Sequence, residues 1–257
     1  MGDRKKYIIN EITKYSQKLD QKGFGANHDG NISALFENTI LATPTAVSKG
    51  NVVSDIIITL DSTGKKISGH GNAFSEIKLH LAAYKARSDI KAVVHAHPPF
   101  ATARGLVGLS LKPALPEAIV SIGDLIPVAP FAMPGDAAND AIIADMVNDY
   151  DVFMMAGNGV LAVGDSVEQA YLRLELAEHL IKINYYAEKF GNPMTLSAEN
   201  IALLLEKRKA AGLGPQARNK AVNTDTTISS QKKKQAPLDM ITKIIAEEIN
   251  DLIHKEK

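Results

Sequence analysis

The sequence predicts an α/β protein in which helices flank a mixed β-sheet. Segments with helical periodicity alternate with short apolar runs, but without the regular strand–helix–strand repeat of an all-parallel sheet. The chain has 257 residues, of which 45% are hydrophobic, and this is enough for one sizeable core. After Gly212 the sequence turns polar, so we expect the folded unit to occupy residues 1–214.

The first third of the chain is predicted to contain one helix and three strands. Residues 4–20 carry one apolar helical face, and Gly23 follows them. The runs at 32–36 and 39–43 are strand-like and lie among glycine and polar residues, and 54–66 is a strand followed by a turn.

The centre of the chain combines a helix with a buried strand. Residues 75–87 have helical spacing, and the valine-rich run that follows ends at Pro98 and Pro99. The later predicted elements are an apolar run at 125–130, a helix at 137–149, two strands broken at 157–159, a helix opened by Ser166 with Gln169 in a capping box, and a helix from Ser197 to Gly212.

The C-terminal region differs in character from the rest of the sequence. Residues 215–236 are polar and poor in large apolar side chains, which is typical of a flexible linker. Residues 237–257 regain strong helical periodicity, with an apolar stripe opposite a polar face, and predict a separate amphipathic helix. The stripe consists of Leu238, Ile241, Ile245, Ile249 and Leu252.

Composition excludes several classes of protein. The formal net charge is +0, so nothing indicates a nucleic-acid or membrane partner. No apolar run approaches membrane-spanning length, and the N-terminus has no signal-peptide core, so we expect a cytoplasmic location. Because the chain has no cysteine, only His, Asp, Glu and Asn side chains remain as candidate metal ligands.

A candidate metal site lies in the central helix and strand. On a strand, side chains two positions apart share a face, so His95 and His97 point the same way. Glu76 adds a carboxylate at the start of the preceding helix. Taken singly, a His-x-His pair is often incidental and a glutamate there often serves the helix dipole.

The joint pattern has greater weight than its parts. Ser75-Glu76, a helix of about three turns and the run from Asp89 to Pro98 together resemble the class II aldolase/adducin family, over residues 5–212. That family contains L-fuculose-1-phosphate aldolases and L-ribulose-5-phosphate 4-epimerases. The resemblance implies a three-layer α/β/α fold with a central mixed, largely antiparallel sheet, and a homotetramer with active sites near subunit boundaries.

The resemblance also assigns roles to individual residues. It implies that Glu76, His95 and His97 hold a divalent metal, usually zinc, and that Glu76 doubles as the acid/base. Aldol cleavage must stabilise an enediolate, which a Lewis acid and a nearby proton donor accomplish together. The positions that match the family's substrate phosphate contacts are Gly30, Asn31, Thr45, Ala46, Phe74 and Ser75, where Phe74 replaces a hydroxyl.

Asn158 is the main departure from the family pattern. The family has a third metal-binding histidine before a glycine at this position, whereas this chain has Asn158-Gly159. Because zinc prefers imidazole over a neutral amide oxygen, we expect Asn158 to be a weak fourth ligand and the metal to be loosely bound. His28 and His70 lie in nearby loops and are weaker candidates, and His80 and His179 are interpreted as structural.

Three functions remain open from the sequence. The first is metal-dependent aldol cleavage of a ketose 1-phosphate, with L-fuculose 1-phosphate, giving dihydroxyacetone phosphate and L-lactaldehyde, as the best guess. The second is a sugar-phosphate 4-epimerase or dehydratase on the same scaffold. The third is a metal-impaired, non-catalytic relative, which Asn158 favours and which the retained Glu76, His95 and His97 oppose.

The amphipathic helix at 237–257 has two interpretations. Placed after a polar linker, it resembles the encapsulation peptides that direct enzymes into bacterial microcompartments, so shell proteins are a candidate partner. Alternatively, it packs on its own tetramer.

Overall fold

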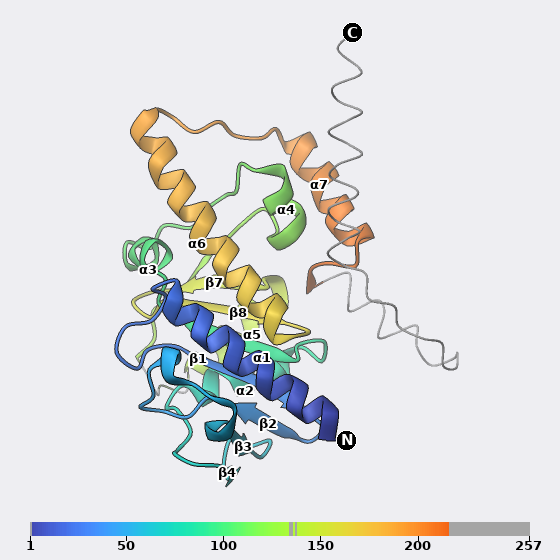
Figure 1. Ribbon diagram of the computed structural model, residues 1–257. Coiled ribbons are helices and arrows are strands. Elements are labelled where there is room, and N and C mark those ends of the chain that lie inside the picture. The colour runs from blue at the N-terminus through green and yellow to red at the C-terminus, as the bar shows by residue number, and fades with distance from the viewer. Residues whose placement is uncertain (1, 134–135, 137, 216–257) are drawn as a thin grey trace, which may run out of the picture. The chain divides into compact units, whose positions relative to one another are not determined.

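The computed structural model describes residues 2–133, 136 and 138–215, and these fold into three layers (Figure 1). The helices are α1 (Gly2–Gln21), α2 (Ile77–Ala86), α3 (Pro99–Leu106), α4 (Pro116–Ile122), α5 (Ala138–Asp149), α6 (Val167–Phe190) and α7 (Ala198–Ala210). The strands are β1 (Asn31–Phe36), β2 (Thr39–Ala42), β3 (Ile58–Leu60), β4 (Lys66–Ser68), β5 (Ala92–Ala96), β6 (Val128–Ala129), β7 (Val152–Met155) and β8 (Val160–Gly164).

The eight described strands form one sheet in the order β4-β3-β2-β1-β5-β8-β7-β6. Neighbouring strands pair antiparallel except β6 and β7, which are parallel. The sheet is therefore mixed and largely antiparallel, as predicted. The register places Asn31, the first residue of β1, opposite His95 of β5.

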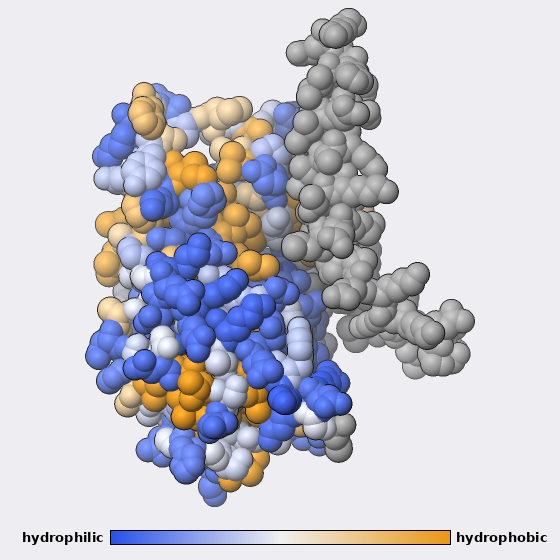
Figure 2. Space-filling view, in the orientation of Figure 1, coloured by the Kyte–Doolittle hydropathy of each residue, from blue (hydrophilic) through white to orange (hydrophobic). Residues whose placement is uncertain are grey.

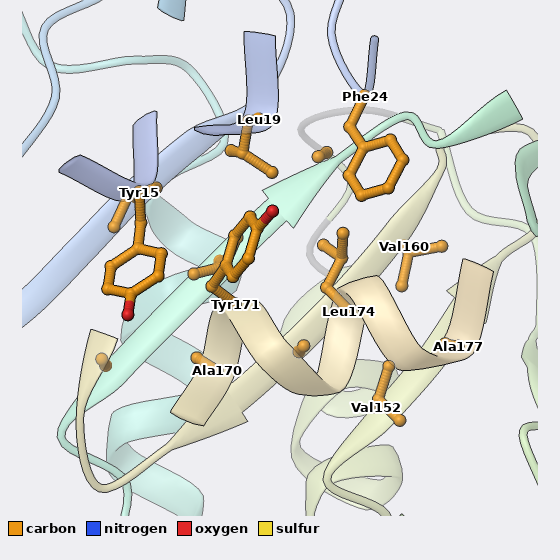
Figure 3. Close-up of a cluster of buried hydrophobic side chains, with 14 of the residues drawn as sticks. Tyr15, Leu19, Phe24, Val152, Val160, Ala170, Tyr171, Leu174 and Ala177 are labelled. Carbon is orange, nitrogen blue, oxygen red and sulfur yellow. The ribbon is translucent and has the colours of Figure 1, made fainter. Parts of the chain in front are cut away.

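Helices α1 and α6 cover one face of the sheet (Figure 1). Tyr15 and Leu19 of α1 pack with Tyr171 and Leu174 of α6, above strand residues that include Val160 (Figure 3). The two tyrosine rings lie 4.8 Å apart between centroids. The helical face predicted for residues 4–20 is therefore confirmed as part of the main core.

Helices α2 and α5 contact each other and cover the opposite face of the sheet. Because strand side chains alternate between faces, β5 sends Ala92, Val94 and Ala96 to the α1/α6 side and Val93 to the α2/α5 side. His95 and His97 follow the alternation of Val93, so both histidines belong to the α2/α5 side.

The structure contains elements that the sequence pattern did not predict. Helices α3 and α4 each begin at a proline, Pro99 and Pro116, at the first helical position. Proline is favoured there because the missing N–H would have no partner inside the helix. Pro99 is predicted only to end a strand, Pro116 has no predicted role, and the predicted turn ends at residue 66, where the short edge strand β4 begins.

Within the described residues, no helix is both long and apolar enough to cross a bilayer. Figure 2 shows mainly hydrophilic residues over the outward side of α1. The predicted linker, from residue 216 onward, and the predicted helix at 237–257 lie outside the described residues.

Candidate active site

Four segments meet on the α2/α5 side of the sheet, at the ends of its inner strands β1, β5, β7 and β8. Glu76 immediately precedes α2, His95 is near the end of β5, Asn31 opens β1, and Asn158 lies in the turn between β7 and β8. Three of these residues were proposed as metal ligands and Asn31 as a phosphate contact. The fold thus brings together residues that are far apart in the sequence.

The two histidines present their Nε2 atoms to each other. His95 Nε2 lies 3.2 Å from His97 Nε2. The Nδ1 of His95 lies 2.9 Å from the carbonyl oxygen of Val160 and must donate its proton there, since a carbonyl only accepts. The Nδ1 of His97 faces Asp29 at 3.5 Å. Because His95 Nδ1 carries a proton, the lone pair of its Nε2 is available either for a hydrogen bond from His97 Nε2 or for a bound cation.

Glu76 is held by two side-chain amides. Asn31 Nδ2 donates to Oε2 at 2.9 Å, and Asn158 Nδ2 donates to Oε1 at 2.7 Å. Oε2 also lies 3.4 Å from His95 Nε2. Burial alone would raise the pKa of Glu76, but the interactions with His95 and with the two amides outweigh it and hold the pKa at about 2. The carboxylate is therefore ionised at neutral pH.

The spacing of these donor atoms is close to the spacing that a divalent ion requires. Two ligands on a tetrahedral zinc lie about 3.3 Å apart when each bond is about 2.0–2.1 Å. The separations of His95 Nε2 from His97 Nε2, 3.2 Å, and from Glu76 Oε2, 3.4 Å, match this value. Within the described residues, however, no three His, Asp or Glu side chains converge as a metal cluster. The two spacings therefore suit a divalent ion, although the described side chains do not converge on one ion position.

A glycine brings the β7–β8 turn close to the histidines. Gly159 has a φ of +71°, and a Cβ at this position would lie 2.3 Å from the carbonyl oxygen of Ala96 and 2.4 Å from His97 Cδ2. Only glycine is compatible with that approach. The close contact carries the neighbouring Asn158 to Glu76, so the geometry of the turn determines which residue reaches the carboxylate.

The residues matched to phosphate contacts fall into two groups. Thr45, Ala46 and Ser75 are exposed, and Ala46 adopts a left-handed φ of +58°. The Asn31 side chain is instead engaged by Glu76, and the Phe74 ring is buried 5.0 Å from the His80 ring. Phe74 can thus offer only its backbone to a ligand. Gly30 has a φ of +78° and precedes Asn31.

Lys49 is a residue of this region that the sequence analysis did not identify. It is 3% exposed, and its Nζ donates to the carbonyl oxygens of Val47 at 2.6 Å and His28 at 3.3 Å. Burial lowers the pKa of Lys49, although the nearby Asp29 opposes this. Lys49 therefore ties the loop before β1 to the loop after β2. A single lysine in a polar loop carries no sequence signal of this role.

A cavity of about 180 Å³ adjoins the carboxylate of Glu76. Its apolar lining residues include Leu79, Ile143 and Met155, and Asn158 and Glu76 also line it. Polar and charged side chains, Ser75, Lys78, Asp136, Asn139 and Asp140, complete the lining. Glu76 is thus reachable from solvent, and its side chain is 25% exposed. His28 and His70 are exposed in their loops.

Comparison with known proteins gives consistent results. Residues 10–185 match the family model described as the class II aldolase and adducin N-terminal domain. The 3-oxo-tetronate 4-phosphate decarboxylase of Pectobacterium atrosepticum is 30% identical over 67% of this chain and 81% of its own length. The L-fuculose phosphate aldolase of Escherichia coli K12 is 29% identical over 80% of this chain and 96% of its own.

Solved structures show the same fold. A structure of L-fuculose 1-phosphate aldolase superimposes with a TM-score of 0.71 at 26% identity, covering 79% of this chain and 96% of that chain. The three-layer arrangement expected from the sequence is therefore confirmed.

Proposed function

The chain belongs to the class II aldolase and adducin family, and from this premise we propose that it is a carbon–carbon lyase acting on a phosphorylated sugar. The observation that carries the proposal is the ionised Glu76 carboxylate beside the paired Nε2 atoms of His95 and His97. Our preferred reaction is cleavage of a ketose 1-phosphate, with L-fuculose 1-phosphate as the first substrate to test.

In this reaction the bond between C3 and C4 of the ketose breaks. The C4 hydroxyl gives its proton to the Glu76 carboxylate and becomes the aldehyde, while the electron pair remains on C3 next to the ketone. Glu76 is the acid/base that exchanges a proton with the C3 position. A divalent metal, zinc by family precedent, would be held by His95, His97 and Glu76 and would supply Lewis-acid stabilisation of the developing negative charge.

The charges around Glu76 suggest how the substrate is oriented. Asp136 and Asp140 line the adjoining cavity, where they would repel a phosphate. Thr45 and Ala46 are exposed and do not line this cavity, and with Gly30, Asn31 and Ser75, which does line it, they form the proposed phosphate side. The cavity is then left for the aldehyde end, whose hydroxyl groups suit its polar lining.

Decarboxylation is the second candidate, favoured by the 30% identical relative named as a 3-oxo-tetronate 4-phosphate decarboxylase. Loss of carbon dioxide from such a substrate also leaves an electron pair on a carbon next to a ketone. The product after protonation is dihydroxyacetone phosphate, as in the aldol cleavage. One acid/base and one Lewis acid therefore serve either reaction, and the group that leaves distinguishes them.

An assay with both substrates tests these candidates. Purified protein is incubated with L-fuculose 1-phosphate or with a 3-oxo-tetronate 4-phosphate, with and without added zinc, manganese or cobalt. Release of dihydroxyacetone phosphate with L-lactaldehyde supports the aldolase, and its release with carbon dioxide supports the decarboxylase. A rearranged sugar phosphate would indicate a 4-epimerase, a dehydrated one a dehydratase, and no turnover under any condition a non-catalytic relative.

Assembly and location are further parts of the proposal. By family precedent we expect a homotetramer in the cytoplasm. We also propose that residues 237–257 act as an encapsulation peptide for a bacterial microcompartment. Deletion of residues 215–257 should leave activity intact and abolish association with shell proteins. If the truncated protein loses activity or its oligomeric state, the segment stabilises the enzyme itself.

A further inference from the structure

A line of hydrogen bonds leads from the interior to Glu76. Tyr84 OH lies 2.7 Å from Ser33 Oγ, and Ser33 Oγ lies 2.7 Å from His80 Nδ1. His80 Nε2 lies 2.7 Å from Asn31 Oδ1, and Asn31 Nδ2 lies 2.9 Å from Glu76 Oε2. His80 and Ser33 are fully buried and Asn31 is 4% exposed, so water cannot substitute for these partners.

Two regular elements supply all of these side chains. Glu76, His80 and Tyr84 recur every four residues along α2 and therefore share one side of the helix. Asn31 and Ser33 are two residues apart on β1 and therefore share one face of the sheet. Helix α2 lies on that face, so side chains of the helix and side chains of β1 alternate along the line of hydrogen bonds.

The chemistry of the groups fixes the direction of each hydrogen bond. The Asn31 amide donates from Nδ2 to Glu76 Oε2, and its carbonyl oxygen therefore faces His80 Nε2. The Nε2 of His80 must then carry the ring proton. Burial lowers the pKa of His80 to about 3, so the ring is neutral and its Nδ1 accepts from the Ser33 hydroxyl. The Tyr84 hydroxyl in turn donates to Ser33.

We propose that His80, held in one tautomer by Ser33 and Tyr84, is a positioning residue that fixes the orientation of the Asn31 amide and through it the carboxylate of Glu76. An amide can rotate by a half turn with little change in shape. In the rotated state its carbonyl oxygen would face Oε2, and two acceptors would repel each other. The N–H at His80 Nε2 disfavours the rotated state, because the NH2 group of Asn31 would then face it and two donors would repel each other.

The tautomer of His80 can be measured without reference to catalysis. In protein labelled with ¹⁵N-histidine, the ring nitrogen shifts distinguish Nε2–H from Nδ1–H, and the His80→Gln variant assigns the signals. We expect wild-type His80 as the Nε2–H tautomer, and a rise in the Nδ1–H form in Ser33→Ala. An Nδ1–H tautomer in the wild-type protein would overturn the proposal.

The kinetic test rests on the proposed function and uses a matched pair of variants. His80→Gln keeps an N–H donor near the position of Nε2–H, whereas His80→Leu removes it. We expect kcat to fall about 10–100-fold in His80→Leu, the range typical of residues that orient a ligand through hydrogen bonds. KM should change by much less, and His80→Gln should recover most of kcat. His179→Gln, at an exposed position on α6, is the control without effect.

The outcomes separate the two proposals. Equal losses of kcat in His80→Gln and His80→Leu would mean that the volume of the side chain matters and not its donor, and would contradict the positioning role. If the wild-type protein cleaves neither substrate, the proposed function fails, and the ¹⁵N measurement still decides the tautomer. Thermal unfolding of each variant shows whether a loss of kcat arises from a loss of fold.

Discussion

Glu76 and Asp151 are two enclosed carboxylates held in opposite ways. Glu76 accepts from the neutral amides of Asn31 and Asn158 and lies beside a cavity. Asp151, the residue before β7, is fully buried among three guanidinium groups at 2.8–3.0 Å. These come from Arg87 after α2, Arg173 on α6 and Arg208 on α7.

Both carboxylates have a pKa below the ordinary value, but from different causes. Burial alone would raise the pKa of Asp151, and the charges of Arg173, Arg87 and Arg208 outweigh it. At Glu76 the interaction with His95 lowers the pKa most, and the hydrogen bonds from the Asn158 and Asn31 amides come next. Several positive charges bind a carboxylate firmly and join distant helices. Neutral donors keep it ionised yet leave it able to exchange a proton and to face a cation. A depressed pKa therefore does not by itself identify a catalytic residue.

The largest expected difference between the two carboxylates is in catalysis. Glu76→Gln should reduce kcat by about 10²–10⁴-fold, the contribution typical of a general acid–base group, while the fold is retained. Steady-state kinetics of this variant beside Glu117→Gln, an exposed control on α4, measure the effect. Turnover near that of the wild type would remove Glu76 from the mechanism.

Asp151→Asn should show the opposite pattern. Removing the negative charge leaves three buried or nearly buried guanidinium groups uncompensated, and breaking such a cluster costs about 3–5 kcal/mol of unfolding free energy. Urea unfolding of this variant and of Asp145→Asn, an exposed control on α5, provides the measurement. Equal stability of the two variants would show that the cluster does not hold the helices to the sheet.

Replacing Asn158, one of the two amide donors to Glu76, by a histidine tests whether the surroundings of Glu76 can hold a metal ion. Asn158→His should tighten zinc binding by at least about tenfold, because imidazole is the better zinc ligand. Zinc stoichiometry by elemental analysis and competition with a chelator would show the change, with Asn158→Ala as the variant that lacks both groups. Equal zinc content in wild type and Asn158→His would mean that this position does not reach the metal.

The smallest expected effect is a difference in pH dependence. The folded state holds the pKa of Asp151 below 3.8, its value in the unfolded chain, so its contribution to stability is complete above that pH. As the pH falls below about 4, the unfolded state takes up the proton first and the contribution is lost. Unfolding free energies measured from about pH 5 to pH 3 should therefore fall more steeply in the wild type than in Asp151→Asn. Parallel curves would contradict the assignment.

Much of the fold could be predicted from local sequence patterns. The face of α1 formed by Ile12, Tyr15 and Leu19, and the alternation that puts His95 and His97 on one side of β5, depend on neighbours within a few residues. The cap of α6 is also local, since Ser166 accepts from the backbone N–H of Gln169 as its capping box predicts.

The sequence alone also determined which residue types are available for chemistry. The absence of cysteine, the spacing of Glu76 from His95 and His97, and the asparagine at position 158 are facts of the chain. Their combined resemblance to one family predicts the three-layer fold that the structure shows. The proline at the first helical position of α3 and of α4 is likewise a local signal of the sequence.

Only the tertiary structure decided which polar groups become partners. The Asn31 amide contacts Glu76 and His80, and the Phe74 ring is buried beside His80. Arg87, Arg173 and Arg208 all contact Asp151. Periodicity reports the side of an element that a residue occupies, because backbone geometry repeats locally. It carries no information on which residue of another element lies opposite. That depends on how the helices settle on the sheet, and at Asn158 on the close approach that Gly159 permits.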